Sequence, residues 1–243
     1  MRRYSVILAL VLGTVFNAAA FEDLFDKAQA AYDDGRYAEA VILYDNMVSN
    51  GVANTEVIYN LANAYFKDGD LPQAVWHYRE AWYAAPRDPD IRANLHFALS
   101  AAGAIEPAYG LPGRIFSTLS SGEWVAAAIA AYLLLALLLA MALLLRSMRP
   151  HLLKASLVPA ALLLLALAGW RYWGLFTQAP EGVIVKSGTT ALYGPVEGST
   201  AHFDVPLAAL VRQRGSDPKG WAEIEYDGKT GWVKKDNILL LYP

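Results

Sequence analysis

Three strongly apolar blocks divide the chain into segments of different character. They span residues 6–16, 124–145 and 152–176, and the segments between and after them have ordinary polar and charged content. The middle block has about 22 residues, which at 1.5 Å per residue gives a helix of about 33 Å, enough to cross a hydrocarbon core of about 30 Å. The pattern therefore predicts a transmembrane helix over residues 123–145.

The third block predicts a second, shorter span over residues 152–173. Lys154 and Arg171 bracket its uncharged stretch, and both lie near an end, where a long side chain reaches the interface. Pro159 lies in its first turns, and aromatic residues at its far end are typical of a membrane interface. The two spans predict a membrane hairpin.

Two signals predict the orientation of this hairpin. Residues 1–20 have a basic start, an apolar centre and an Ala-x-Ala cleavage site ending at Ala20, which is typical of an export signal; the alternative is an uncleaved anchor. The connection 146–151 holds Arg146, Arg149 and His151, and positive loops face the cytoplasm. Both signals predict an inner-membrane protein whose N-terminal and C-terminal domains are periplasmic.

The polar segment 21–103 contains an internal repeat with a period of 34 residues. Small residues recur where paired helices approach, and glycines recur where the chain turns between them. The second copy resembles the tetratricopeptide signature at Ile58, Leu61, Ala62, Tyr65, Gly69, Ala74, Tyr78, Ala81 and Pro86. The first copy departs from it at Lys27, Ala31 and Met47, and the segment that starts at Pro89 predicts a single capping helix.

The tetratricopeptide resemblance implies a concave groove lined by the first helix of each repeat. The groove positions of that family fall here on Phe25, Gln29, Tyr32, Tyr59, Asn63, Phe66, Lys67 and Phe97. Aromatic rings beside two amides suit an extended or helical peptide of a partner protein. The alternative interpretation is that the aromatic residues of this set pack between neighbouring helices.

Residues 104–122 have the composition of a linker, with Gly110, Pro112 and Gly113. The stretch from Arg114 to Leu119 is either a short amphipathic segment at the lipid interface or a plain part of this linker.

Residues 180–243 alternate short β-rich runs with Gly and Pro, which predicts a small β-barrel. The run from Trp221 through Gly231-Trp232-Val233 resembles the bacterial SH3 domain, although Ala208 and Ala209 stand where that family has a glycine. Trp221 and Trp232 are candidate partner contacts, and the alternative is that they fill the barrel core.

Composition removes several function classes. A net charge of −3 gives no basic surface for nucleic acid, and the absence of cysteine excludes disulfides and thiolate metal sites. His77, His96, His151 and His202 fall in four separate contexts, and no phosphate-binding loop or nucleophile elbow occurs. We therefore predict a non-enzymatic protein with no catalytic, metal-binding or cofactor-binding residues.

The whole arrangement is a multidomain α, membrane and β chain: helix-turn-helix repeats, a two-helix transmembrane hairpin and an SH3-like barrel. This order resembles the BatE family of the Bat aerotolerance operon. The resemblance implies membrane-anchored partners of the Bat type with von Willebrand factor A domains, in an envelope stress complex with a MoxR-type ATPase. The leading hypothesis is a scaffold or adaptor, and the alternative is a peptidoglycan-binding cell-wall sensor that acts through the barrel.

Overall fold

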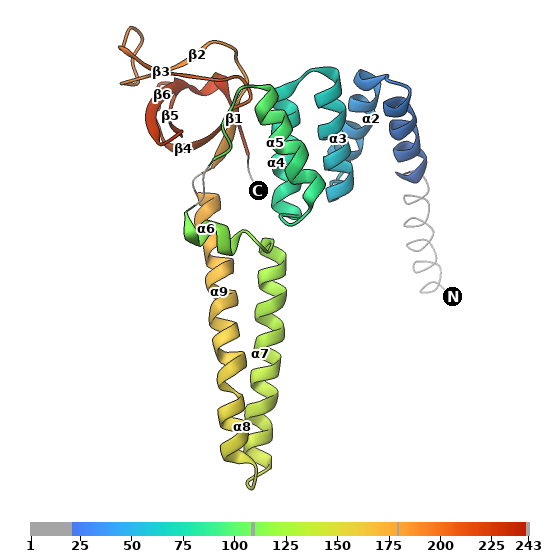
Figure 1. Cartoon of the computed structure of the whole chain (residues 1–243), viewed down its shortest axis with the longest axis vertical. Coiled ribbons are helices and arrows are strands. Elements are labelled where there is room, and N and C mark those ends of the chain that lie inside the picture. The colour runs from blue at the N-terminus through green and yellow to red at the C-terminus, as the bar shows by residue number, and fades with distance from the viewer. Residues whose placement is uncertain (1–20, 108–109, 179, 242–243) are drawn as a thin grey trace, which may run out of the picture.

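The structure is a computed structural model that describes residues 21–107, 110–178 and 180–241. The chain is rich in helix, with a C-terminal antiparallel sheet and two long apolar helices that project from the folded remainder (Figure 1). The predicted export signal, residues 1–20, lies outside the described residues.

The N-terminal part is a row of helices, which we call the helical module. It comprises a helix over residues 21–33, α2 (Tyr37–Ser49), α3 (Thr55–Asp68), α4 (Leu71–Ala84) and α5 (Pro89–Ala101). Asn54, Asp70 and Asp88 each cap the helix that follows, by accepting hydrogen bonds from its first backbone N–H groups. Two helix pairs and a single closing helix result, an arrangement compatible with the 34-residue period.

Two glycines make the turns within the helix pairs possible. Gly35 and Gly69 have φ angles of 76° and 93°, in the left-handed region that favours glycine. The small residues of the period are fully buried, as expected for helices in close contact: Ala28, Ala40, Ala62 and Ala74 have no exposed surface.

The two long helices form an antiparallel pair, which we call the hairpin. α7 (Ser121–Leu144) begins with a capping box between Ser120 and Glu123. α8 (Arg149–Ala155) and α9 (Leu157–Gln178) then run back along α7 toward the folded modules. Two segments, Ser121–Leu144 and Arg149–Gly174, are long and apolar enough to cross a membrane. Only 11% and 28% of their most apolar stretches are buried, whereas the core helix of a soluble protein is mostly buried.

The return segment differs from prediction at its beginning. It starts at Arg149 rather than residue 152, and α8 and α9 are separated at Ser156. Pro159 explains the break, because it lacks the N–H that would bond the carbonyl of Ala155 in a continuous helix.

The linker contains a short helix, α6 (Leu111–Phe116). Figure 1 shows α6 lying across the end of the hairpin that is next to the folded modules. We call that end of the hairpin its head end.

The C-terminal part is a seven-stranded antiparallel sheet, the sheet module, in the order β3-β2-β6-β5-β4-β1-β7. Its strands are β1 (Glu181–Ile184), β2 (Thr189–Leu192), β3 (Ala201–Val205), β4 (Leu210–Ser216), β5 (Trp221–Tyr226), β6 (Lys229–Lys234) and β7 (Ile238–Leu240). β5 and β6 form a hairpin around Asp227 and Gly228, whose φ angles of 49° and 71° suit a tight two-residue turn. Ala208, at the position where the SH3 resemblance expects glycine, has a φ of 60° and is fully buried.

Candidate functional site

A groove on the helical module is the candidate binding site. It encloses a cavity of about 160 Å³ lined by Tyr32, Asn63, Phe66, Lys67, Tyr78, Asn94 and Phe97. Five of the eight predicted groove residues are in this set. The repeat period therefore brings residues from four helices to one concave position.

The floor of the groove is a network of amides and phenols. The Oδ1 atom of Asn63 accepts hydrogen bonds from the Tyr78 hydroxyl at 2.6 Å and from Nδ2 of Asn94 at 3.2 Å. Nδ2 of Asn94 also donates to the Tyr59 hydroxyl at 2.7 Å. The contact between the two amides pairs an oxygen of Asn63 with a nitrogen of Asn94, so the two side chains present opposite ends to each other.

The tyrosines of this floor are neutral hydrogen-bonding groups. Burial raises the pKa of Tyr78 well above its ordinary value, so its hydroxyl stays protonated and donates to Asn63. Burial also raises the pKa of Tyr59, against a smaller lowering by a hydrogen bond with Asn63. Asn94 Oδ1, in contrast, accepts no hydrogen bond from any residue that the structure describes.

The wall of the groove is aromatic and carries one positive charge. The rings of Phe66 and Phe97 lie 5.4 Å apart, and Phe97 is 61% exposed. A phenylalanine ring this exposed, beside a partly buried one, is a surface on which an apolar side chain can pack. Lys67 is exposed at the same cavity and forms no ion pair within the described part of the chain.

The remaining three predicted groove residues lie outside the cavity lining. Phe25 packs edge-on against Tyr44 at 5.9 Å, next to the core of the first helix pair. Gln29 accepts a hydrogen bond from the Tyr44 hydroxyl at 3.1 Å. The Tyr59 ring packs against that of Tyr78, and its hydroxyl accepts a hydrogen bond from Asn94 of the floor. For Phe25 and Tyr59 the structure thus shows packing between helices, and for Phe97 it shows an exposed ring.

Two groove residues were missed by the sequence analysis. Tyr78 was predicted only as a position of the tetratricopeptide signature. Asn94 lies one turn before Phe97, the position that the 34-residue period assigns to the capping helix. A search for polar residues within one turn of the aligned position would have found Asn94, because it lies 31 residues after Asn63.

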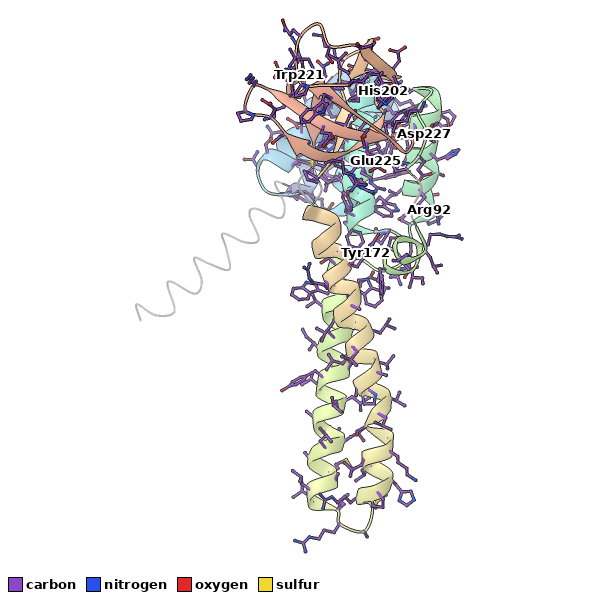
Figure 2. All side chains as sticks on the ribbon, turned by 90° about the vertical axis from the view of Figure 1, so that its left-hand side faces the viewer. Arg92, Tyr172, His202, Trp221, Glu225 and Asp227 are labelled. Atoms are coloured by element: carbon purple, nitrogen blue, oxygen red, sulfur yellow. The ribbon has the colours of Figure 1, made fainter. Side chains whose placement is uncertain are left out.

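The two tryptophans predicted on the sheet module lie in different surroundings. Trp221 is only 8% exposed, and Trp232 is partly buried opposite Leu192 and Glu223. Figure 2 shows Trp221 at the end of the molecule that is far from the hairpin. Among the described aromatic residues of this module, the exposed one is instead Tyr193, 63% exposed, whose ring lies 4.0 Å from that of His202.

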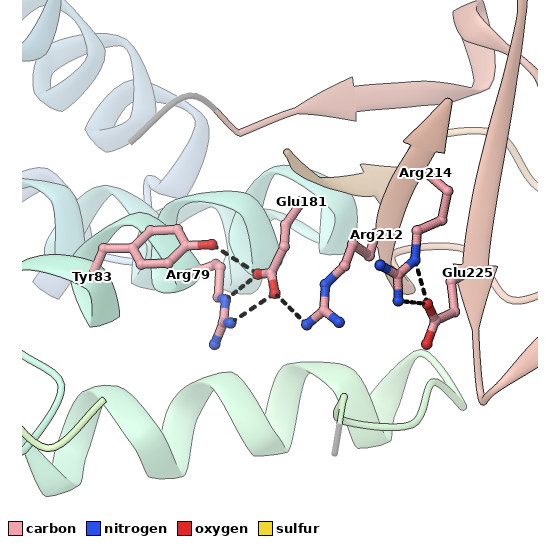
Figure 3. A network of polar contacts seen from close by, with 6 residues as sticks. All are labelled: Arg79, Tyr83, Glu181, Arg212, Arg214 and Glu225. Atoms are coloured by element: carbon pink, nitrogen blue, oxygen red, sulfur yellow. Dashed lines mark hydrogen bonds and ion pairs between the residues drawn. The ribbon is translucent and has the colours of Figure 1, made fainter. Parts of the chain in front are cut away.

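A buried ion pair joins the helical module to the sheet module (Figure 3). Arg79 on α4 donates from Nε and Nη2 to the two carboxylate oxygens of Glu181 on β1, at 2.7 Å and 3.1 Å. The Tyr83 hydroxyl donates to the same carboxylate at 2.9 Å, and Arg212 lies 3.9 Å from it. The Arg79 and Glu181 side chains are 0% and 2% exposed, so this junction excludes water.

Aromatic rings continue this junction to the hairpin. The Arg79 guanidinium lies 4.1 Å above the ring of Trp82, and Trp82 and Tyr83 both contact Trp173 of α9. Trp76 of α4 donates to the carbonyl of Leu240 in β7. One helix of the helical module therefore contacts both the sheet and the hairpin, and all three parts meet at α4.

The described residues include no group of three or more His, Asp or Glu side chains placed to hold a metal ion. The fold and the site together define a helix-rich protein with a C-terminal antiparallel sheet, two helices long and apolar enough to span a membrane, and a groove with an amide floor. Comparison of the sequence with protein-family models finds no match, and comparison with curated proteins finds none either.

Proposed function

We propose that this protein is a non-enzymatic adaptor of the inner membrane that holds a segment of a partner protein in the groove of its helical module. The observation that carries this proposal is the groove itself, where Asn94 offers an unused acceptor beside the exposed ring of Phe97. The helical module would be a pair of tetratricopeptide repeats with a capping helix, and the sheet module an SH3-like barrel.

The amide floor suits the main chain of an extended peptide. Asn94 Oδ1 can accept from a peptide N–H, and Asn63 Nδ2, which has two hydrogens, can donate one to a peptide carbonyl. An apolar side chain of the peptide would pack against the rings of Phe66 and Phe97. An acidic side chain of the peptide would form an ion pair with Lys67. Recognition of the main chain gives affinity with little dependence on sequence, so the aromatic wall and the lysine would supply the specificity.

Two features support the proposed membrane orientation. The far end of the hairpin carries Arg146 in the connection and Arg149 and His151 in the first turn of α8, and the folded modules lie together at the opposite end of the hairpin. Positive loops face the cytoplasm, so the modules would be periplasmic. The partners would be membrane-anchored proteins with von Willebrand factor A domains, as the BatE resemblance implies, and nucleic acid would not be among them.

Co-purification tests the proposal. The tagged full chain would be isolated from its native membrane in detergent, and we expect a membrane-anchored protein with a von Willebrand factor A domain to be retained. Asn94→Ala and Phe97→Ala should each lower its recovery about tenfold, because one hydrogen bond or one aromatic contact contributes about 1.4 kcal/mol.

Ile42→Ala is the matched control, since Ile42 is 67% exposed on α2 and does not line the groove. Recovery of no such partner, or equal recovery by the groove variants and the control, would show that the proposal is wrong.

The exposed ring of Tyr193, which packs against the half-buried His202, favours a second candidate, a sensor that binds peptidoglycan through the sheet module. Sugar rings stack on exposed aromatic side chains, and Figure 2 shows His202, the neighbour of Tyr193, away from the hairpin. Sedimentation with purified sacculi separates the two functions. A sensor would sediment and Tyr193→Ala would abolish this, whereas the adaptor would stay in solution.

A further inference from the structure

The lipid boundary at the head end of the hairpin follows from the length of α7. From Trp124 to Leu145 the helix rises about 32 Å, which matches a hydrocarbon core of about 30 Å. Tryptophan prefers the level of the lipid headgroups, and Trp124 lies in the first turn of α7. In a bilayer the hydrocarbon therefore begins close to Trp124.

The short helix α6 is held at this same level. The indole nitrogens of Trp124 and Trp173 both donate to the carbonyl of Phe116, at 3.0 Å and 3.1 Å. The Phe116 ring packs against Trp124 at 5.9 Å and against Tyr172 at 5.4 Å. These contacts clamp the end of α6 to both hairpin helices where they leave the membrane.

The outer surface of α6 is apolar and uncovered. Leu111 and Ile115 are 70% and 49% exposed, and residues four apart lie on one face of a helix. Arg114, also exposed, stands beside them. Apolar side chains next to a cation, on a helix at the headgroup level, match the composition of elements that lie in the membrane interface.

We propose that α6 is a third lipid-contacting element, embedded in the boundary between headgroups and acyl chains through Leu111 and Ile115. Lipid is the occupant that the structure favours, because Trp124 and Trp173 hold α6 at the end of the two apolar helices, where the proposed hydrocarbon layer begins. The proposal rests on the membrane anchoring described above. Its consequence is that the folded modules sit directly on the bilayer, at a fixed height and tilt, instead of at the end of a free linker.

The natural absence of cysteine makes a direct test possible. Single variants Leu111→Cys and Ile115→Cys would be labelled with a polarity-sensitive fluorophore, and the full chain reconstituted into vesicles that contain lipids with quenchers both near the headgroup and along the acyl chain. Both positions are exposed, so labelling does not disturb the packing of α6.

Two reference positions calibrate the result. Leu137→Cys lies within α7 and is 57% exposed, and Ile42→Cys lies on α2 and is 67% exposed. We expect quenching at positions 111 and 115 at least about threefold stronger than at position 42, as for an element in the interface. Quenching at 137 with none above the position 42 level at 111 and 115 would overturn the role of α6 alone. Absence of quenching at 137 would overturn the membrane anchoring, and this proposal with it.

Discussion

Two buried tyrosines make the helical module sensitive to alkaline pH. Burial, with a smaller contribution from Asp33, raises the pKa of Tyr44 to about 12, and burial raises that of Tyr78 as well. The ordinary tyrosine pKa is about 10, so the folded state holds these protons more tightly than the unfolded state. The resulting stability is complete below pH 10 and is lost as the pH rises from about 10 through about 12.

We expect the free energy of unfolding to fall by about 1–2 kcal/mol between pH 10 and pH 12, beyond the loss shown by a variant without these groups. Denaturant unfolding in detergent, followed by circular dichroism, measures it. A double variant with Tyr44→Phe and Tyr78→Phe should have a flatter profile, and Tyr193→Phe, at a side chain that is 63% exposed, should not. Equal profiles for the double variant and the parent chain would contradict the assignment.

Single site residues can be predicted from the sequence where the helical repeat sets their positions. They cannot be predicted where segments far apart in the sequence come together in the fold. Asn63, Phe66 and Phe97 follow from the period of 34, because each occupies a set position on its helix. Arg79 and Glu181 do not, because 102 residues separate them and nothing in either neighbourhood specifies the other. Ala208 illustrates a third case. Its backbone has the left-handed conformation that would favour the glycine of the SH3 pattern, although the residue is alanine.

Among the elements, the contact between α7 and α9 depends on one glycine. A Cβ atom on Gly169 would lie 2.3 Å from the ring of Trp124, much closer than side-chain atoms approach one another. Gly174, on the same helix, has only an ordinary contact at 3.8 Å. The glycine at 169 thus makes room for the tryptophan that also holds α6.

We expect Gly169→Ala to destabilise the chain by about 1–3 kcal/mol, the usual effect of overpacking, and to shift tryptophan fluorescence. Gly174→Ala is the matched control, and it should be neutral or slightly stabilising because alanine favours helix. Thermal unfolding in detergent compares the two. Equal stability of both variants would mean that α9 shifts freely around Trp124.

Elements with a long or strong pattern were predictable, and short ones were not. The helices of the repeat and the long apolar segments of the hairpin follow from periods and lengths that persist over many residues. β3 and β7 have weak sequence patterns, because β3 mixes charged and aromatic residues and β7 has only three residues. The separation of α8 from α9 is a consequence of Pro159, which is evident in the first turns of the predicted span, but the apolar pattern alone does not specify where the helix breaks.

For the whole molecule, the buried pair of Arg79 and Glu181 decides whether the two modules act as one body. Removing one partner leaves a buried charge without compensation, so Glu181→Gln should destabilise the junction by about 3–5 kcal/mol. We expect faster proteolysis in the linker of residues 104–122, which follows the helical module, measured on the full chain in detergent.

The exposed pair of Lys234 and Glu197 supplies the control. Glu197→Gln should leave the proteolysis rate unchanged, because solvent screens an exposed pair. A second variant that replaces both buried charges, Arg79→Met with Glu181→Leu, should restore much of the protection. If Glu181→Gln were cleaved as slowly as the parent chain, the pair would not hold the modules together.

The position of this pair in the chain also imposes an order on biosynthesis. Arg79 is translated before the hairpin and Glu181 after it. In the membrane topology proposed above, both apolar helices would therefore have to be inserted before the carboxylate could reach the guanidinium. A chain whose second helix fails to insert would strand Glu181 across the bilayer from Arg79, with the interface of the helical module bare. In the proposed topology the junction would thus form only in chains whose two apolar helices are both inserted.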